Sequence, residues 1–111
     1  MIAKRPSIFI YTFQPDRAVL REVCAGIEEN GVFFEVFERE ISDPEALAHE
    51  AANDSMMGAG IGICGRLAAL QMKGLPKEKP VDLLRDAAPA DCRRIGANSA
   101  RAIKKMPLLQ Q

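Results

Sequence analysis

Several patterns that are typical of enzymes and of secreted proteins are missing from this sequence. The three cysteines lie far apart, are odd in number and form no C-x-x-C pair, so they cannot make a complete disulfide framework. Cys24 and Cys64 fall within apolar patterns, which predicts buried thiols in a reducing compartment. The single histidine, His49, lies in a predicted helix with no cysteine nearby, and there is no G-x-S-x-G elbow or Walker lysine. An unaided enzyme is therefore not expected.

Net charge and long apolar stretches are lacking as well. Lys+Arg and Asp+Glu both number 15, so the net charge is zero. The chain as a whole therefore has no electrostatic attraction to nucleic acid or to an anionic membrane. After Lys4 and Arg5 comes only the short apolar run Ile8–Phe13, with no cleavage pattern and no stretch approaching a membrane span. We expect a cytoplasmic protein with no membrane and no nucleic-acid partner. A neutral small protein is poorly protected against association, which favours a chain that works in a complex.

The composition that remains is that of an ordinary globular domain. The 111 residues suit a single domain over 1–111, and apolar and charged residues make up 48% and 27% of the chain. In the first part of the chain, Ser7–Phe13 and Val32–Phe37 are predicted strands, rich in β-branched and aromatic residues. Between them Asp16 can cap a helix, and Asn30-Gly31 supplies its left-handed stop. The apolar stripe of this helix has spacing i, i+3, i+4, i+7: Leu20, Val23, Cys24 and Ile27. Strand, helix and strand in this order form a βαβ unit with parallel pairing.

The middle of the chain continues the alternation. Ser42, Pro44 and Glu45 match a capping box and open a second helix that runs to about Asn53. Gly58–Gly65 is predicted as a third strand whose small residues permit close backbone approach. A phosphate-binding loop is the weaker interpretation, because these glycines lie within the strand and not between strand and helix.

The last third is less clearly patterned. Arg66–Met72 is either a helix or a short edge strand, and Val81–Leu84 is a possible last strand. Asp91 is predicted to cap a final helix that runs to about Lys105. The residues of this helix expected to face inward are Ile95, Ser99, Ala102, Ile103 and Met106. The fold class is α/β, with a single-domain, open and mostly parallel sheet flanked by helices.

The end of the first predicted helix carries two adjacent carboxylates, Glu28 and Glu29. A helix carboxyl end already bears partial negative charge, so acids there are disfavoured by roughly 0.3–1 kcal/mol each. They are either solvated glutamates on an exposed turn or carboxylates reserved for a cation or for a partner surface.

The final helix carries one polar and basic face. Its members follow the spacing i, i+4, i+7, i+11: Arg94, Asn98, Arg101 and Lys105. This face is either solvated or contacts an acidic protein surface or nucleic acid. Nucleic acid is the weaker option because no aromatic platform lies beside these cations.

Taken together, the segments resemble the small subunit of the reactivating factor for cobalamin-dependent diol and glycerol dehydratases. Each motif alone is weak, but the ordered set extends from about Arg21 to Leu108. The residues that carry the resemblance are Arg21-Glu22-Val23, Gly26–Phe34, Gly60–Cys64, Lys73–Pro76, Arg94–Arg101 and Lys104–Leu108.

The resemblance implies a non-catalytic, chaperone-like role. The family's small subunit assembles with a large, actin-like ATPase subunit, which binds ATP and ADP. The factor acts on a dehydratase whose cobalamin is damaged, and the small subunit is thought to replace a dehydratase subunit of similar fold, which lets the cofactor escape. Association with a bacterial microcompartment is compatible with this role.

The resemblance also assigns the helix-end carboxylates. In the family, a glutamate of this last turn helps to ligate Mg²⁺ at the contact with the large subunit, which by position is Glu29 here, with Glu28 as the alternative and a candidate interface residue. Arg94, Asn98 and Arg101 are further candidate interface residues. The competing interpretation is a structural medium subunit of the dehydratase, or a short paralogue of it. Such subunits typically carry an amino-terminal extension, for which a strand starting by Ser7 leaves no room. A small nucleic-acid-binding α/β module is the third alternative.

Overall fold

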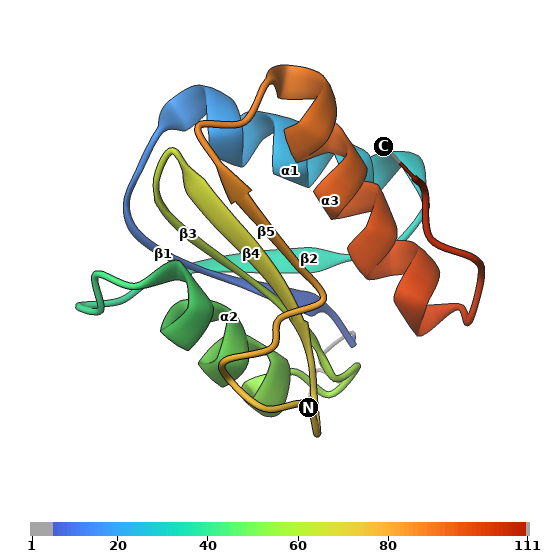
Figure 1. The fold of residues 1–111 in the computed structure, drawn as a ribbon. Helices are drawn as coiled ribbons and strands as arrows, with labels where there is room; N and C mark the ends of the chain where they lie inside the picture. Colours follow the sequence, from blue (N-terminus) through green and yellow to red (C-terminus); the bar gives the residue numbers. More distant parts are fainter. Residues whose placement is uncertain (1–5, 111) are drawn as a thin grey trace, which may run out of the picture.

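The computed structural model describes residues 6–110, which form a five-stranded sheet with helices on both faces (Figure 1). In chain order the elements are β1 (Ile8–Pro15), α1 (Arg17–Glu29), β2 (Phe34–Glu38), α2 (Pro44–Asp54), β3 (Ala59–Gly65), β4 (Leu67–Met72), β5 (Asp82–Arg85) and α3 (Pro89–Ile103). Within these residues no helix is long and apolar enough to cross a lipid bilayer.

The strands lie in the order β2-β1-β3-β4-β5. β1 pairs in parallel with both β2 and β3, whereas β4 is antiparallel to β3 and to β5. The sheet is therefore mixed, with β4 alone running against the other strands, and the predicted open, mostly parallel α/β fold is confirmed. α1 and α3 cover one face and α2 covers the other (Figure 1).

The predicted βαβ unit is present with the expected helix ends. The backbone N–H groups of Ala18 and Val19 donate to Asp16 Oδ1 at 2.9 and 3.1 Å, which caps α1 as predicted. Asn30 is the carboxyl-terminal cap, and Gly31 follows with φ of +71°, in the left-handed region that glycine favours.

Tight packing of the glycine-containing third strand is also confirmed. A Cβ atom on Gly60 would lie 2.2 Å from the backbone nitrogen of Ala52, and one on Gly62 would lie 2.2 Å from the carbonyl oxygen of Pro44. Both neighbours are backbone atoms of α2. The two glycines thus let α2 lie directly on β3, which closes this face of the sheet.

The segment left open between helix and edge strand is β4, an internal strand. Ala68, Ala69, Leu70 and Gln71 are each at most 1% exposed, because β4 lies between β3 and β5 with helices on both faces. The helix propensity of its leucines and alanines is overridden by burial on two sides. The predicted edge position was wrong.

Two predicted helix starts were wrong in detail. α2 is capped by Asp43, whose Oδ1 accepts the Glu45 N–H at 3.0 Å, and Ser42 lies outside the helix. α3 begins at Pro89 without a side-chain cap, so Asp91 lies in the first turn instead of capping it. A proline is well suited to this first helical position because its missing N–H would have no partner there.

The carboxyl end of α3 and the thiols also differ from expectation. α3 ends at Ile103 instead of Lys105, and Met106 is 42% exposed, so it does not face inward. Cys24 and Cys64 are half-buried rather than buried, whereas Cys92 is buried. Ile95 and Ser99 face the core as predicted.

Candidate functional site

The position of the last turn of α1 is fixed by a backbone-to-backbone crossing with α3. A Cβ atom on Gly26 would lie 2.1 Å from the carbonyl oxygen of Arg93, and one on Gly96 would lie 2.1 Å from that of Val23. Neither position can hold a side chain unless the helices separate. This contact brings the side chains of Arg93 and of the acids on α1 within reach of one another.

Arg93 of α3 pairs with Glu29 at the helix end and with Glu22 nearer the middle of α1. Its Nη1 lies 2.9 Å from Glu29 Oε2, and its Nε and Nη2 lie 3.1 and 2.7 Å from Glu22 Oε1. The hydrogen bond with Glu22 and the charges of Glu22 and Glu29 raise the pKa of the Arg93 guanidinium. α1 has no basic residue in its own last turn, so a cation from the neighbouring helix takes that role.

The two candidate glutamates differ in surroundings. Glu29 forms the ion pair with Arg93, and its side chain remains 57% exposed. Glu28 is exposed as well, and it contributes to the raised pKa of the Cys24 thiol on the same helix. Lys104 Nζ donates to the carbonyl oxygen of Asn30, so a second cation lies beside this helix end.

The chemistry of Glu29 fits a shared cation site better than a complete one. Carboxylate oxygens are the ligands that Mg²⁺ prefers, and the Glu29 side chain is open to a partner. Among residues 6–110, no group of three His, Cys, Asp or Glu side chains is placed to hold a metal ion. Any ion at Glu29 would therefore need further ligands from elsewhere, and the metal assignment stays a prediction.

The predicted basic face of α3 lies under the carboxyl-terminal tail. Asn98 is 4% exposed and binds Leu109 in both directions, donating from Nδ2 at 3.2 Å and accepting its N–H at 2.7 Å. Arg101 Nε donates to the carbonyl oxygen of Pro107 at 2.7 Å. The Arg94 side chain is 12% exposed and pairs with Asp91 at 2.6 Å. Their role at an interface is untested, and for Asn98 it would require the tail to move.

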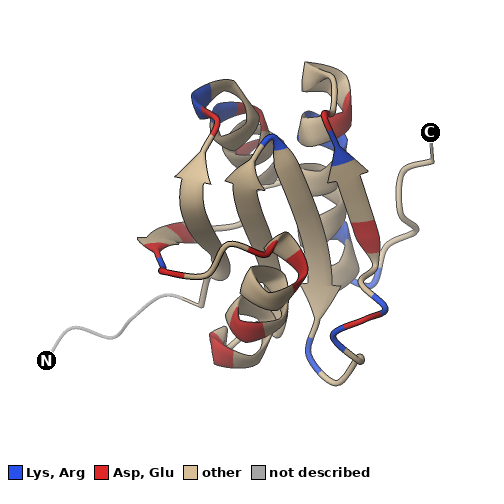
Figure 2. Cartoon of the chain, turned by 60° about the vertical axis from the view of Figure 1, so that its left-hand side comes forward, with Lys and Arg blue, Asp and Glu red and all other residues tan. Residues whose placement is uncertain are grey.

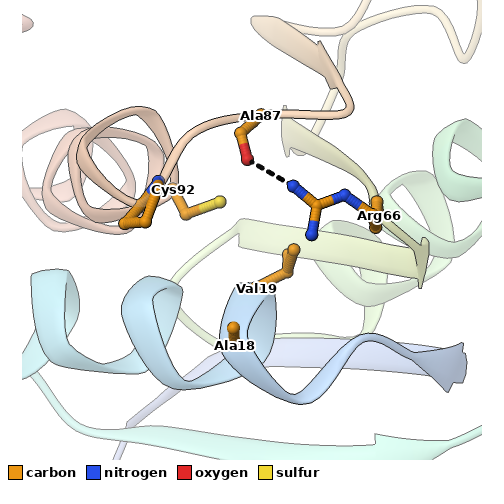
Figure 3. A pocket seen from close by; sticks show the side chains of 6 residues that line it. Ala18, Val19, Arg66, Ala87 and Cys92 are labelled. Carbon is orange, nitrogen blue, oxygen red and sulfur yellow. Dashed lines mark hydrogen bonds between the residues drawn. The ribbon is translucent and has the colours of Figure 1, made fainter.

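A second concave site lies where the carboxyl ends of β1 and β3 meet, the usual ligand position in open α/β sheets. Here Arg66 lies 3.6 Å from Asp16 and 2.5 Å from Asp86, and its Nη2 donates to the carbonyl oxygen of Ala87 at 3.1 Å. Figure 3 shows Arg66 and the buried Cys92 facing each other across the pocket. The cavity of about 30 Å³ has room for one or two water molecules and is too small for a nucleotide.

The mixed sheet with helices on both faces and the exposed acidic helix end define a small α/β domain. The chain belongs to the dehydratase medium subunit family, whose model matches residues 5–109. Within that family it is similar to the propanediol dehydratase-reactivating factor small subunit of Citrobacter freundii, at 33% identity over 103 residues that cover 92% of this chain and 89% of the relative. The diol dehydratase-reactivating factor small subunit of Klebsiella michiganensis is 29% identical and is covered over 82% of its length.

Solved structures give the same result. The diol dehydratase-reactivating factor complexed with ADP and Mg²⁺ matches with a TM-score of 0.87 at 28% identity, covering 96% of this chain and 100% of that one. The glycerol dehydratase reactivase matches with a TM-score of 0.89 at 26% identity, covering 96% and 98%. The resemblance to reactivating-factor small subunits seen in the sequence is therefore confirmed.

Proposed function

We propose that this chain is the small subunit of an ATP-dependent reactivating factor that frees diol or glycerol dehydratase of damaged cobalamin. The observation that carries the proposal is similarity over nearly the whole length, in sequence to small subunits of such factors and in structure to chains of two of them. The chain itself has a non-catalytic role. Its large, actin-like partner subunit binds and hydrolyses ATP.

Subunit exchange is the mechanism that the family membership supports best. One family model, named for a dehydratase subunit, also matches this chain, whose relatives are reactivating-factor subunits. A protein with the fold of a dehydratase subunit can occupy that subunit's place in the target. The displaced contacts then loosen the dehydratase, and the damaged cofactor leaves.

Glu29 is proposed to hold one side of a Mg²⁺ site shared with the large subunit. The relevant observation is an exposed carboxylate on a rigidly packed helix end, with no complete set of metal ligands beside it in residues 6–110. A bound Mg²⁺ ion would link Glu29 to oxygen ligands of the partner. Glu28, Arg94, Asn98 and Arg101 are proposed as further contacts at subunit interfaces.

The metal proposal is tested by Glu29→Gln with Glu28→Gln as the matched control. The affinity of the full chain for the large subunit is measured by titration in Mg²⁺ and after chelation. We expect chelation to weaken binding of the native chain and of Glu28→Gln by about tenfold or more, and to leave the already weak Glu29→Gln complex unchanged. Arg93 keeps its bonds to Glu22 in Glu29→Gln, so the melting temperature should change little. Equal chelation effects in the native and Glu29→Gln chains would contradict the metal assignment.

The function itself is tested by reconstitution with inactivated dehydratase. Large subunit plus this chain and ATP should release damaged cobalamin, whereas the large subunit alone should not. During release, this chain should be recovered bound to dehydratase subunits. Release that proceeds equally well without this chain would refute the proposal.

The second candidate is a structural medium subunit of the dehydratase, which the name of the matching family model favours. In that case the chain would be recovered from its native cell in stoichiometric amounts with an active, cobalamin-bound catalytic subunit. Recovery with a large ATPase instead distinguishes the reactivating factor.

A further inference from the structure

Strand β2 lies at one edge of the sheet. Among residues 6–110 it is paired as a strand with β1 alone, and it ends the strand order. The carbonyl oxygen of Phe33 and the N–H of Arg39 bond to β1, at 2.9 and 2.8 Å. By the alternation of a parallel ladder, the backbone N–H and C=O groups of Phe34, Val36 and Glu38 point away from β1, toward solvent. β2 therefore offers a ready template for another strand.

The opposite edge, β5, is protected in ways that β2 is not. β5 has only four residues, and Asp86 directly after it turns the chain with φ of +50°. The carboxyl-terminal tail lies beside its start, where Leu108 and Leu109 line a hollow together with Asp82. β2 has no proline, no lysine and no bulge in its five-residue register with β1, which are the usual devices that blunt an edge.

Apolar side chains are exposed along the same edge. Phe33 is 52% exposed and Val36 is 40% exposed. α2 packs on β1, β3 and β4. Next to β2, the same face of the sheet carries the side chain of Arg39 in place of a helix. The guanidinium carbon of Arg39 lies 4.2 Å from the ring centre of Tyr11 and 5.6 Å from that of Phe37. Arg39 thus lies over the aromatic rings beside this edge.

The charge around β2 selects the kind of partner. From Glu28 to Asp54 the chain has nine acidic side chains and a single Lys or Arg, Arg39. Figure 2 shows the acids gathered along α2 and the segment that leads to it. Glu35 and Glu38 lie on β2 itself. Pairing of β2 with β2 of a second copy would bring two acidic surfaces together, so a second copy is disfavoured.

We propose that the β2 edge binds an extended strand of another protein in which lysine or arginine alternates with apolar residues. Backbone hydrogen bonds to Phe34, Val36 and Glu38 supply the pairing, and contacts with Phe33 and Val36 and with the acids supply selectivity. A short loop joins the Glu29 end of α1 to β2. Binding of a strand at the β2 edge nevertheless depends neither on a metal ion nor on which large subunit is the partner.

The first test uses the full chain and a synthetic peptide of four Lys-Val repeats, with four Glu-Val repeats as the matched control. Amide hydrogen exchange is followed residue by residue by NMR. The Lys-Val peptide should slow exchange of the Phe34, Val36 and Glu38 amides by about tenfold or more at saturation. The effect should weaken in high salt, and the Glu-Val peptide should have none. Unchanged exchange at these three amides, or equal protection by both peptides, would overturn the proposal.

The second test compares Val36→Pro with Val36→Thr. Proline removes an N–H that points away from β1, so it leaves the β1–β2 ladder intact while blocking the outer side. Val36→Pro should lose the peptide-induced protection at Phe34 and Glu38 and keep a cooperative melt, whereas Val36→Thr should retain both. Peptide protection that persists in a folded Val36→Pro chain would overturn the proposal. Failure of reconstitution with dehydratase would refute the proposed function without affecting either peptide result.

Discussion

Gly96→Ala is predicted to destabilise the protein although alanine is the better helix former. The added Cβ atom would lie 2.1 Å from the carbonyl oxygen of Val23, whereas ordinary contact begins at 3.4 Å. The obstacle is backbone of α1, which cannot turn away as a side chain can. α1 and α3 must therefore separate by about 1 Å along their crossing, which weakens packing on both sides of it.

The two opposing terms can be compared. Replacing a helical glycine by alanine gains about 1 kcal/mol of helix propensity. Overpacking of a close interface costs about 1–3 kcal/mol and occasionally more, and a clash with rigid backbone lies at the upper end. The net loss is about 2 kcal/mol, which corresponds to a fall of about 8 °C in melting temperature for a chain of this size.

Thermal melting and urea titration of the two chains measure this loss. Gly26→Ala should behave similarly, because its Cβ would lie 2.1 Å from the carbonyl oxygen of Arg93. Gly65→Ala is the control for backbone conformation alone, since it has φ of +58° and nothing within 4 Å of its Cβ, and should lose about 1 kcal/mol. A melting temperature of Gly96→Ala above that of the native chain would refute the close-crossing argument.

Two further predictions concern titrating groups on α1. Burial, with the charge of Glu28 adding to it, raises the pKa of the Cys24 thiol from 9.0 to about 11, so alkylation by iodoacetamide should stay slow at pH 8 and accelerate toward pH 11. The folded chain keeps this proton where the unfolded chain has lost it, so stability should fall between pH 9 and 11, and less so in Cys24→Ala. Asp16→Ala removes the cap of α1 and should lower the melting temperature by about 4 °C at pH 7, with Asp16→Asn falling less. Hydrogen bonds from the Val19 and Ala18 N–H groups lower the pKa of the Asp16 carboxyl, so this difference should be present above pH 3.8 and vanish as the carboxyl is protonated at lower pH.

The parts of the fold that follow from local chemistry could be predicted from the sequence. The two ends of α1, at Asp16 and at Asn30-Gly31, and its apolar stripe are determined by residues a few positions apart. The same holds for the close-packed glycines of β3. For β4 the sequence could not decide between helix and strand, because its state depends on burial between two strands, which outweighs the helix propensity of leucine and alanine. At α2 the adjacent Ser42 and Asp43 are both good capping residues, and only the path of the chain decides between them.

The candidate site was predictable only in part. The acidic end of α1 is visible in the sequence, but its partner Arg93 is 64 residues away and meets Glu29 only because Gly26 and Gly96 let the helices touch. The basic pattern of α3 is also visible, whereas its cover by Pro107 and Leu109 depends on the path of an irregular tail. Periodicity identifies the face of a helix but does not show what lies over it.

Arg93 binds Glu22 through two nitrogens and Glu29 through the third. If Glu29 exchanged its counter-ion, the bonds between Arg93 and Glu22 would still join α3 to α1. A divalent ion that binds at Glu29 competes with a guanidinium already in place. The affinity that such an ion would show is the difference between its own attraction to Glu29 and that of Arg93. In the free chain Arg93 keeps the Glu29 carboxylate oriented. If a partner supplied the further ligands of the proposed metal ion, Arg93 would release Glu29 while keeping its bonds to Glu22.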